Sequence, residues 1–319
     1  MEKKQIKKER SLNIVKKNDI VQKARYKLDL IQQKTLMYLI SKIDSIKDVE
    51  FQEITVNLKD LCEIMGINER SGTNLKDLKD AIQKLADKSM WVEMGDADDT
   101  LVLMRWLSEV EIKRGRGSVT VQFDKKMAPY LLQIKDGCFT QYKLIDVLPM
   151  KSMYSLRLYE LVKSHNGQGK WEITVEELRK LLFVDANTYS KYEDFRRRIL
   201  DTAILEICNF TDLLVAYEAK RRDRKIYSLT FEMCECRESR TEHARREINR
   251  ITVLDNLPAE IVPPRKMPTV KEIREEREKQ HKAAELDKMI KKHTRAKSAG
   301  GVSMRDDFMP GQTAIEELM

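Results

Sequence analysis

The sequence contains 319 residues, of which 41% are hydrophobic and 35% are charged. This length is enough for two ordinary domains with cores of their own. No apolar run approaches the roughly 20 residues that cross a bilayer, and the basic start leads into no apolar signal region. The five cysteines are an odd number embedded in apolar patterns, which is typical of a reducing compartment. We therefore expect a cytoplasmic protein with no membrane contact.

The formal net charge of +8 is concentrated at the start of the chain. Residues 1–27 contain ten Lys or Arg and three Asp or Glu. Basic and acidic residues number 17 and 20 in residues 28–148, 15 and 14 in residues 149–236, and 18 and 15 in residues 237–319. We treat residues 1–27 as a basic N-terminal arm. Any affinity for nucleic acid is expected to come from this arm and from local cationic clusters.

Hydrophobic periodicity predicts a folded unit in residues 28–148. Apolar residues spaced by three and four predict a helix over residues 28–43, and a β-rich stretch follows at 51–56. Asn57 is the predicted N-cap of a second helix, which Gly66 ends. A third helix has apolar residues on one face from Leu75 to Leu85. Alternating strands on both sides of the turn 115–117 then predict a β-hairpin.

The same order of elements recurs in residues 149–236. A helix through Met153 and Leu161 precedes a strand at 171–174. Thr174 and Glu177 form the pattern of a capping box, and Ser190 and Glu193 form a second one that starts a longer helix. Strands at 213–219 and 226–233 then flank a tip at Lys220–Lys225.

Direct comparison of the two halves supports an internal duplication. Residues 54–56 match 173–175, residues 60–61 match 177–178 and residues 81–82 match 203–204, at offsets of 119, 117 and 122. We therefore predict an α+β protein with two tandem winged-helix domains at 28–148 and 149–236. Each domain is a three-helix unit backed by a β-hairpin wing.

Residues 237–319 differ from the two predicted domains. Prolines from Pro258 to Pro268 indicate a linker, and the charge-dense stretch 269–297 is compatible with an exposed helix. The low hydrophobicity of the end of the chain predicts no core. We expect a charged C-terminal tail that is largely disordered.

The second domain contains the strongest candidates for DNA binding. A helix-turn-helix places the N-terminal half of its second helix in the major groove. A helical wheel at 100° per residue turns Arg197, Arg198 and Asp201 outward and places Arg196 nearer the core edge. The alternative is that the arginines solvate one face or pair with Glu193 and Asp194. The candidates in this half-helix are Lys191, Tyr192, Asp194, Arg196, Arg197 and Arg198.

The wing tips supply the second group of candidates. Five of the six residues from Lys220 to Lys225 are basic, and wings usually lie along phosphates, where such residues add salt-dependent affinity. The alternative is an ordinary solvated turn. The candidates at this tip are Lys220, Arg221, Arg222, Arg224 and Lys225. Weaker counterparts in the first domain are Lys76 and Lys79 on its second helix and Lys113, Arg114 and Arg116 at its wing. Acidic residues lie beside Lys76 and Lys79, so the alternative for their helix is that it packs against protein.

Catalytic patterns are missing from the sequence. It contains neither GxxxxGK[ST] nor GxGxxG, and its four histidines never form HxH or HExxH. Cys234 and Cys236 lack a second close Cys or His pair. We therefore expect no enzymatic activity, no cofactor and no metal site. A nickase for rolling-circle replication is the least favoured alternative.

Three motifs in the second half resemble the iteron-binding plasmid replication initiator family. These are Leu158-Tyr159-Glu160-Leu161, Glu176-Glu177-Leu178-Arg179 and the run from Phe195 to Ile207. The opening of the chain, with a KKND segment near Asn18 and the stretch 24–28 before a long helix, is similar to the family's usual start. The resemblance covers about residues 12–236, and the tail beyond Arg237 is longer than the family core.

The resemblance implies two winged-helix domains related by pseudo-twofold symmetry, with the main groove-reading helix at Lys191–Cys208. Family members bind repeated origin sequences as monomers and help to open the duplex. As dimers joined through the first domain they can repress their own gene. They lack catalytic activity and recruit the host replication initiator and the replicative helicase. The alternative reading of the same fold is a winged-helix transcriptional regulator with no role in replication.

Overall fold

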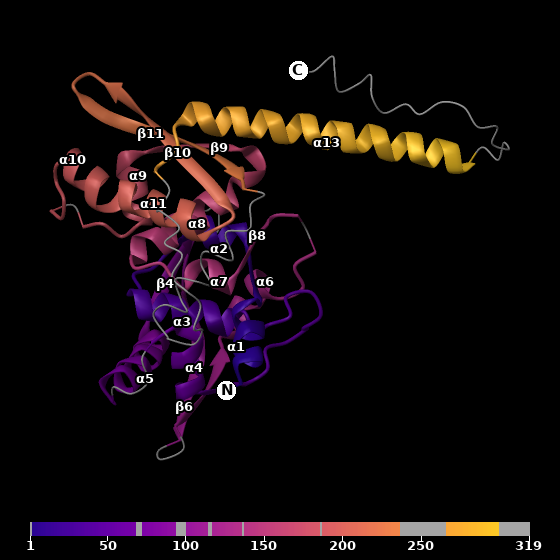
Figure 1. The fold of residues 1–319 in the computed structure, drawn as a ribbon. Helices are drawn as coiled ribbons and strands as arrows, with labels where there is room; N and C mark the ends of the chain where they lie inside the picture. The colour runs from indigo at the N-terminus through magenta and orange to yellow at the C-terminus, as the bar shows by residue number, and fades with distance from the viewer. Residues whose placement is uncertain are drawn as a thin grey trace. The chain divides into compact units, whose positions relative to one another are not determined.

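The computed structural model describes residues 2–67, 72–93, 100–113, 117–135, 137–185, 187–236 and 266–299. The chain divides into two compact units, Met1–Arg274 and Glu275–Met319, and each is described by itself. The first unit contains both winged-helix domains, in agreement with the predicted fold class (Figure 1). None of the described helices is long and apolar enough to cross a bilayer.

The first winged helix is built from three helices and a three-stranded antiparallel sheet. Its elements are α3 (Leu30–Ile40), β3 (Ile54–Asn57), α4 (Leu58–Met65), α5 (Gly72–Asp87), β6 (Leu107–Lys113) and β7 (Ser118–Phe123). The Asn57 side chain accepts hydrogen bonds from the N–H groups of Lys59 and Asp60, and so caps α4 as predicted. Gly66 ends this helix with a left-handed φ of 73°, which glycine adopts without steric cost.

The second winged helix repeats this order. Its elements are α8 (Met153–Ser164), η2 (Asn166–Gln168), β9 (Lys170–Thr174), α9 (Val175–Leu181), α10 (Tyr192–Phe195), the π-helical turn η3 (Arg196–Leu200), α11 (Asp201–Phe210), β10 (Leu213–Arg222) and β11 (Lys225–Glu235). The sheet orders are β3-β7-β6 and β10-β11-β9. In both domains the first strand therefore pairs with the last, which confirms the duplication.

The structural register corrects one of the sequence matches. Asn57 and Thr174 are equivalent, because each caps the helix after its strand and each pairs with a serine, Ser118 or Ser228. Their separation of 117 residues also holds for the match of 60–61 with 177–178. The match of 54–56 with 173–175 at an offset of 119 is therefore wrong by two residues. A slip of two keeps every side chain on its face of the strand, so the alternating pattern could not reveal it.

The N-terminal segment is folded into the first unit and does not form a separate arm. It contains α1 (Lys3–Arg10), β1 (Asn13–Lys17), α2 (Asn18–Lys23) and β2 (Ala24–Arg25). Strand β1 pairs with β8 (Phe139–Lys143), and β2 joins β4 (Ser89–Glu93) and β5 (Leu101–Arg105) in a further sheet. Ile14, Ile20 and Val21 are buried. The charge count over residues 1–27 does not reveal this apolar set, because the segment is rich in lysine.

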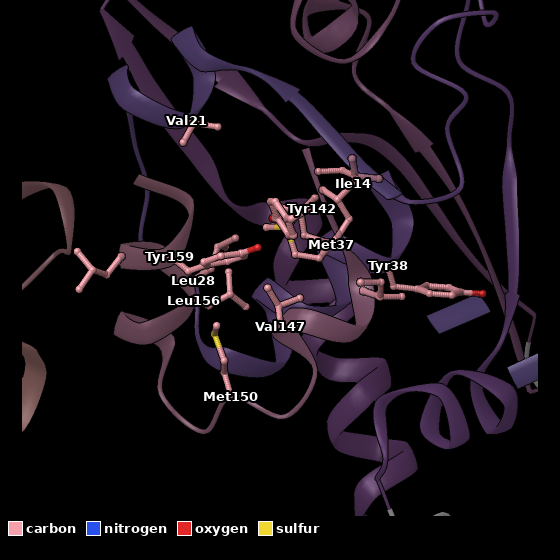
Figure 2. Close-up of a cluster of buried hydrophobic side chains, with 14 of the residues drawn as sticks. Ile14, Val21, Leu28, Met37, Tyr38, Tyr142, Val147, Met150, Leu156 and Tyr159 are labelled. Carbon is pink, nitrogen blue, oxygen red and sulfur yellow. The ribbon is translucent and has the colours of Figure 1, made fainter. Parts of the chain in front are cut away.

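One hydrophobic core runs through both winged helices. Three short elements, η1 (Lys125–Met127), α6 (Ala128–Leu131) and α7 (Leu144–Val147), complete the first domain before α8 begins. Leu156, Tyr159 and Leu161 of α8 are all fully buried. Figure 2 shows Tyr142 beside Met37, and Tyr159 beside Leu28 and Leu156. Helix α8 thus contacts the first domain while it forms the first helix of the second.

A long helix, α13 (Val270–Ala299), confirms the helix expected within residues 269–297. Val270 and Ile273 in its first turn pack against Ala216 and Cys234 on the sheet of the second domain. The Arg274 guanidinium donates hydrogen bonds of 2.8 and 3.0 Å to Glu232. Residues 237–265 and 300–319, on which the expectation of disorder also falls, lie outside the described residues.

Candidate nucleic-acid interface

The helix that we call the recognition helix runs through α10, η3 and α11, from Tyr192 to Phe210. Lys191 is its N-cap, and its side chain makes no capping hydrogen bond. The predicted capping box from Ser190 to Glu193 is therefore wrong. Glu193 instead pairs with Arg196 at 2.9 Å, because a carboxylate and a guanidinium three residues apart meet on one helix face.

The loop before the recognition helix is held by Arg179 of α9, a residue that the site prediction missed. Its guanidinium donates hydrogen bonds to the backbone carbonyls of Thr188, at 3.1 Å, and of Tyr189. The same group lies over the Phe195 ring, 4.5 Å from the ring centre. Arg179 therefore fixes where the recognition helix starts. The signal for Arg179 in the sequence was its position in the Glu176-Glu177-Leu178-Arg179 motif of the family.

Arg197 and Arg198 are exposed on the first half of the recognition helix, as the helical wheel predicted. Arg197 pairs with Asp194 at 3.4 Å, with 70% of its side chain exposed. Arg198 lies over the Tyr189 ring at 5.6 Å. The pairs Arg196–Glu193 and Arg197–Asp194 are those that the alternative reading anticipated. Exposed ion pairs of this kind contribute little stability, so phosphate oxygens can replace the carboxylates at small cost.

Two residues of this helix point elsewhere than expected. The Tyr192 hydroxyl is buried next to that of Tyr217, so it is not available to a groove. The Asp201 side chain, placed outward by the wheel, is 29% exposed and accepts a hydrogen bond from the Tyr217 hydroxyl at 2.8 Å. The π-helical turn η3 explains the shift of Asp201. It accommodates one extra residue in the turn and displaces the following positions around the helix.

The wing of the second domain is a long hairpin with a cationic end. Its strands continue through Arg222 and from Lys225, so the turn consists only of Asp223 and Arg224 and is shorter than predicted. Asp223 adopts a φ of 57°, which aspartate tolerates better than most residues. Arg221, Arg222, Arg224 and Lys225 are exposed. Lys220 is also exposed but is bound to both carboxylate oxygens of Glu172 at 2.7 Å.

The structure brings the recognition helix and this wing together. The Tyr217–Asp201 hydrogen bond joins β10 to the helix, and the hairpin tip extends from the core on the side where α10 lies (Figure 1). We call the arginines of the helix and the cations of the tip together the helix–wing surface. It consists of Lys191, Arg196, Arg197, Arg198, Lys220, Arg221, Arg222, Arg224 and Lys225.

The candidate cations of the first domain are only partly described by the structure. Lys76 of α5 is exposed and Lys79 is half-buried. Lys113 at the end of β6 is exposed and lies 3.7 Å from Glu111. Arg114 and Arg116, the other two candidates at this wing, lie outside the residues that the structure describes. In the described part of the chain, no three His, Cys, Asp or Glu side chains come together as metal ligands.

Comparison with known proteins gives two family matches and several relatives. The profile described as "Initiator Replication protein, WH1" matches residues 13–163, and "Initiator Rep protein, WH2" matches residues 174–233. The PI protein of Escherichia coli is 32% identical over 132 residues, which cover 36% of this chain and 43% of the relative. An uncharacterized 27.6 kDa protein of Escherichia coli is 23% identical over 155 residues, covering 49% and 64%. The chain thus spans less than two thirds of either curated relative.

Among solved structures, the crystal structure of the Pi initiator protein in complex with iteron DNA resembles this chain. The two are 22% identical, and the TM-score is 0.60. The superposition covers 72% of this chain and 99% of that one. At this level of identity the similarity shows a common fold.

Proposed function

The chain belongs to the replication initiator family that these two winged-helix modules define, and from this premise we propose that it is a plasmid replication initiator that binds iterons. Its target would be double-stranded origin DNA in the bacterial cytoplasm. The observation that carries the proposal is the helix–wing surface, in which exposed arginines on a recognition helix stand beside a cationic hairpin tip. A helix that enters the major groove beside a wing on the phosphates needs this arrangement.

In this proposal the second domain, residues 149–236, makes the main contacts to DNA. Arg197 and Arg198 would reach base edges or nearby phosphates, because they are exposed and lie on the outward face of the half-helix, whereas Arg196 lies nearer the core edge. Arg221, Arg222, Arg224 and Lys225 would follow the phosphate backbone. The first domain, residues 28–148 together with the N-terminal segment that packs on it, would add auxiliary contacts through Lys76, Lys79 and Lys113.

We also propose that a second copy of the chain binds the first domain. The sheet β2-β4-β5 presents Trp91, Leu101 and Leu103 to solvent, with 50%, 55% and 48% of each residue exposed. Trp91 and Leu103 are direct cross-strand partners, and β5 is an edge strand of this sheet among the described residues, where a further strand could add. A dimer formed here would repress its own gene, as family members do. Contacts of the monomer with the host initiator and the helicase, and its help in opening the origin, rest on the family alone.

Specific binding is tested on DNA that the chain itself selects from a pool of random-sequence duplexes. Loss of a base contact costs about 1 to 3 kcal/mol, so the double variant Arg197→Ala/Arg198→Ala should bind the selected duplex at least tenfold more weakly in a mobility shift. Lys180→Ala, an exposed basic residue on α9, is the matched control and should bind normally. An unchanged affinity of the double variant at moderate salt would show that this helix does not read the DNA.

The wing is tested by the salt dependence of binding. Each phosphate contact adds about one unit to the slope of log affinity against log salt concentration. We expect Arg222→Ala/Arg224→Ala to reduce that slope by about two and to weaken selected and shuffled duplexes alike. A loss confined to the selected duplex would assign these residues to base reading instead. Protection of regularly spaced repeats in a footprint of DNA beside the gene would then identify the iterons.

A further inference from the structure

The contact between Asp201 and Tyr217 joins the two parts of the helix–wing surface. Asp201 is the first residue of α11, and Tyr217 lies in the middle of β10, five residues before the end of that strand. The Tyr217 hydroxyl donates to Asp201 Oδ1 at 2.8 Å. Asp201 Oδ2 also lies 3.9 Å from Arg196. One carboxylate therefore contacts the wing strand and an arginine of the recognition helix.

The surroundings fix the geometry of this contact. The Tyr217 ring packs against the buried Phe231 at 5.9 Å, and its hydroxyl lies beside the buried hydroxyl of Tyr192. Burial and the hydrogen bond to Asp201 both raise the pKa of Tyr217, so the phenol remains a donor at neutral pH. Tyr192 belongs to the first turn of the recognition helix. The helix therefore meets Tyr217 of the wing strand twice, through the buried Tyr192 hydroxyl at the start of its cationic half and through the hydrogen bond of Asp201 at the end.

The π-helical turn lies between Tyr192 and Asp201. It spans Arg196–Leu200, the segment that contains the three consecutive arginines. In a π-helical turn the backbone hydrogen bonds span five residues and not four. Such turns are rare in proteins, and those that occur often lie at functional sites. Thr202 Oγ1 donates to the Arg197 carbonyl at 3.2 Å and satisfies part of this altered backbone. Without the extra residue Asp201 would face outward, as the helical wheel shows, and the bond to Tyr217 would be lost.

We propose that Asp201, Tyr217 and the π-helical turn form a clasp that sets the angle between the recognition helix and the wing, and thereby determines sequence specificity. The inference rests on the proposed function. With the clasp closed, Arg197 and Arg198 can meet base edges while the wing tip meets the phosphates of the same duplex. With the clasp open, both cationic groups keep their charge and can still bind DNA. Specific binding should therefore suffer, and non-specific binding should not.

The test measures a ratio of affinities. Fluorescence anisotropy gives the affinity of each variant for the duplex that the wild-type chain selects and for a shuffled duplex of equal length. Tyr217→Phe removes only the hydroxyl, and we expect it to lower the ratio of the two affinities about tenfold, which corresponds to about 1.4 kcal/mol. The salt slope should not change, since no phosphate contact is lost. Tyr130→Phe, a half-buried tyrosine of α6, is the matched control and should leave the ratio unchanged.

Variants at Asp201 separate positioning from folding. Asp201→Asn retains an acceptor for the Tyr217 hydroxyl and should keep most of the ratio, whereas Asp201→Ala should lower it as Tyr217→Phe does. The double variant Asp201→Ala/Tyr217→Phe should be no worse than either change alone, because both remove one contact. A merely structural contact would lower the midpoint of urea unfolding and weaken both duplexes in parallel, and this result would overturn the clasp.

The outcomes distinguish the clasp from the function on which it rests. If the wild-type chain enriches a sequence and Tyr217→Phe discriminates equally well, the clasp is wrong and the proposed function stands. If the wild-type chain enriches no sequence from the pool, the proposal that it binds iterons is wrong, and the proposal of the clasp is wrong as well. A lowered ratio with an unchanged salt slope and an unchanged control supports both.

Discussion

Among single residues, Asp146 has a protonation state that depends on folding. Its side chain in α7 is buried, and its carboxylate accepts a hydrogen bond from the Lys143 N–H at 3.1 Å. Burial, assisted by the negative charge of Asp212, raises the pKa of Asp146 from 3.8 to about 7. A raised pKa means that the folded chain binds the proton more tightly than the unfolded chain. This contribution to stability is complete below about pH 4 and is lost as the pH rises through about 7.

We expect Asp146→Asn to flatten the pH dependence of stability over this interval. The amide keeps an acceptor for the Lys143 N–H and cannot ionise. At about pH 8 the free energy of unfolding of the variant should exceed that of the wild type, by at most about 4 kcal/mol for a pKa displaced by about three units. At about pH 4 the two should be nearly equal. Urea unfolding at both pH values measures the difference.

The control for this prediction is Asp87→Asn, which changes an exposed aspartate at the end of α5. Its pH profile of stability should follow that of the wild type. Identical profiles for the wild type and Asp146→Asn would mean that Asp146 is not protonated in the folded protein near neutral pH. The charges of Lys163 and Lys143 and the hydrogen bond from the Lys143 N–H would then outweigh burial and the repulsion from Asp212.

At the scale of elements, local signals predict the helices of the two winged-helix units, the two wings and the helix α13. They miss α1, α2, α6, α7 and the long-range strand pairing. Asn57 and Gly66 mark the ends of α4 because capping depends only on neighbouring residues. No local pattern pairs Lys16 of β1 with Thr140 of β8, which are 124 residues apart in the chain. For the same reason the charge of residues 1–27 predicts an exposed arm, whereas the fold buries Ile14 and Ile20.

The candidate site was predicted in part. Exposed cations at Arg197 and along the wing follow from helix and hairpin periodicity. The direction of Asp201 does not, because a wheel at 100° per residue assumes an unbroken α-helix and η3 departs from it. The buried hydroxyl of Tyr192 was missed because its neighbour Tyr217 comes from another element. The assignment of individual residues to bases or phosphates stays a prediction.

The first turn of α13 is an element whose contribution is measurable. Ile273 is fully buried in a small cluster with Val270, Ala216 and Cys234. Ile273→Ala leaves a cavity there, and we expect it to cost about 2 kcal/mol, at the low end for such substitutions because the cluster is small. Opening of this contact should also expose Cys234, which is 4% exposed. Alkylation of the Cys234 peptide, followed by mass spectrometry, should therefore be faster in the variant.

Ile290→Ala provides the matched control on the same helix. Ile290 is 55% exposed, so its loss should leave the Cys234 alkylation rate unchanged, while the gain in helix propensity is the same in both variants. Equal alkylation rates in the wild type and Ile273→Ala would mean that the first turn of α13 does not cover the sheet in solution.

For the molecule as a whole, a buried ionic network links the start of the chain to α8. Lys16 of β1 is 1% exposed and bonds to Glu160, which is 0% exposed. The Tyr142 hydroxyl donates to Glu160 Oε1 at 2.6 Å, and Arg157 lies 3.7 Å from Oε2. Burial tends to raise the pKa of Glu160, but Lys16 and Arg157 hold it below its ordinary value. The carboxylate is therefore ionised and contacts both basic side chains. Burial lowers the pKa of Lys16, and the charge of Glu160 opposes that shift.

Arg157 extends this network across the domains. Its guanidinium donates to the Ala24 carbonyl at 3.0 Å and to the Leu181 carbonyl at 3.4 Å. Nearby, Arg25 of β2 bonds to Glu177 of α9 at 2.9 Å. A rotation of α8 against the first domain would separate buried charges from their partners. Separating buried charges costs more free energy than sliding apolar surfaces past one another. The network therefore fixes the arrangement of the two winged helices more strictly than apolar packing alone would.

This predicts a specific pattern of stabilities. Glu160→Gln should cost about 3 to 5 kcal/mol, because it leaves Lys16 buried without a counter-charge. Adding Lys16→Met to Glu160→Gln should recover part of that loss, since the double variant no longer buries the uncompensated ammonium.

Glu176→Gln, which removes the exposed pair with Lys180, is the control and should have no measurable effect on stability. Urea unfolding of the full chain, followed by circular dichroism, compares the wild type, these three variants and Lys16→Met alone. If Lys16→Met/Glu160→Gln is as unstable as the sum of its single variants, the two charges do not interact, and the domains must be held together by apolar packing around α8.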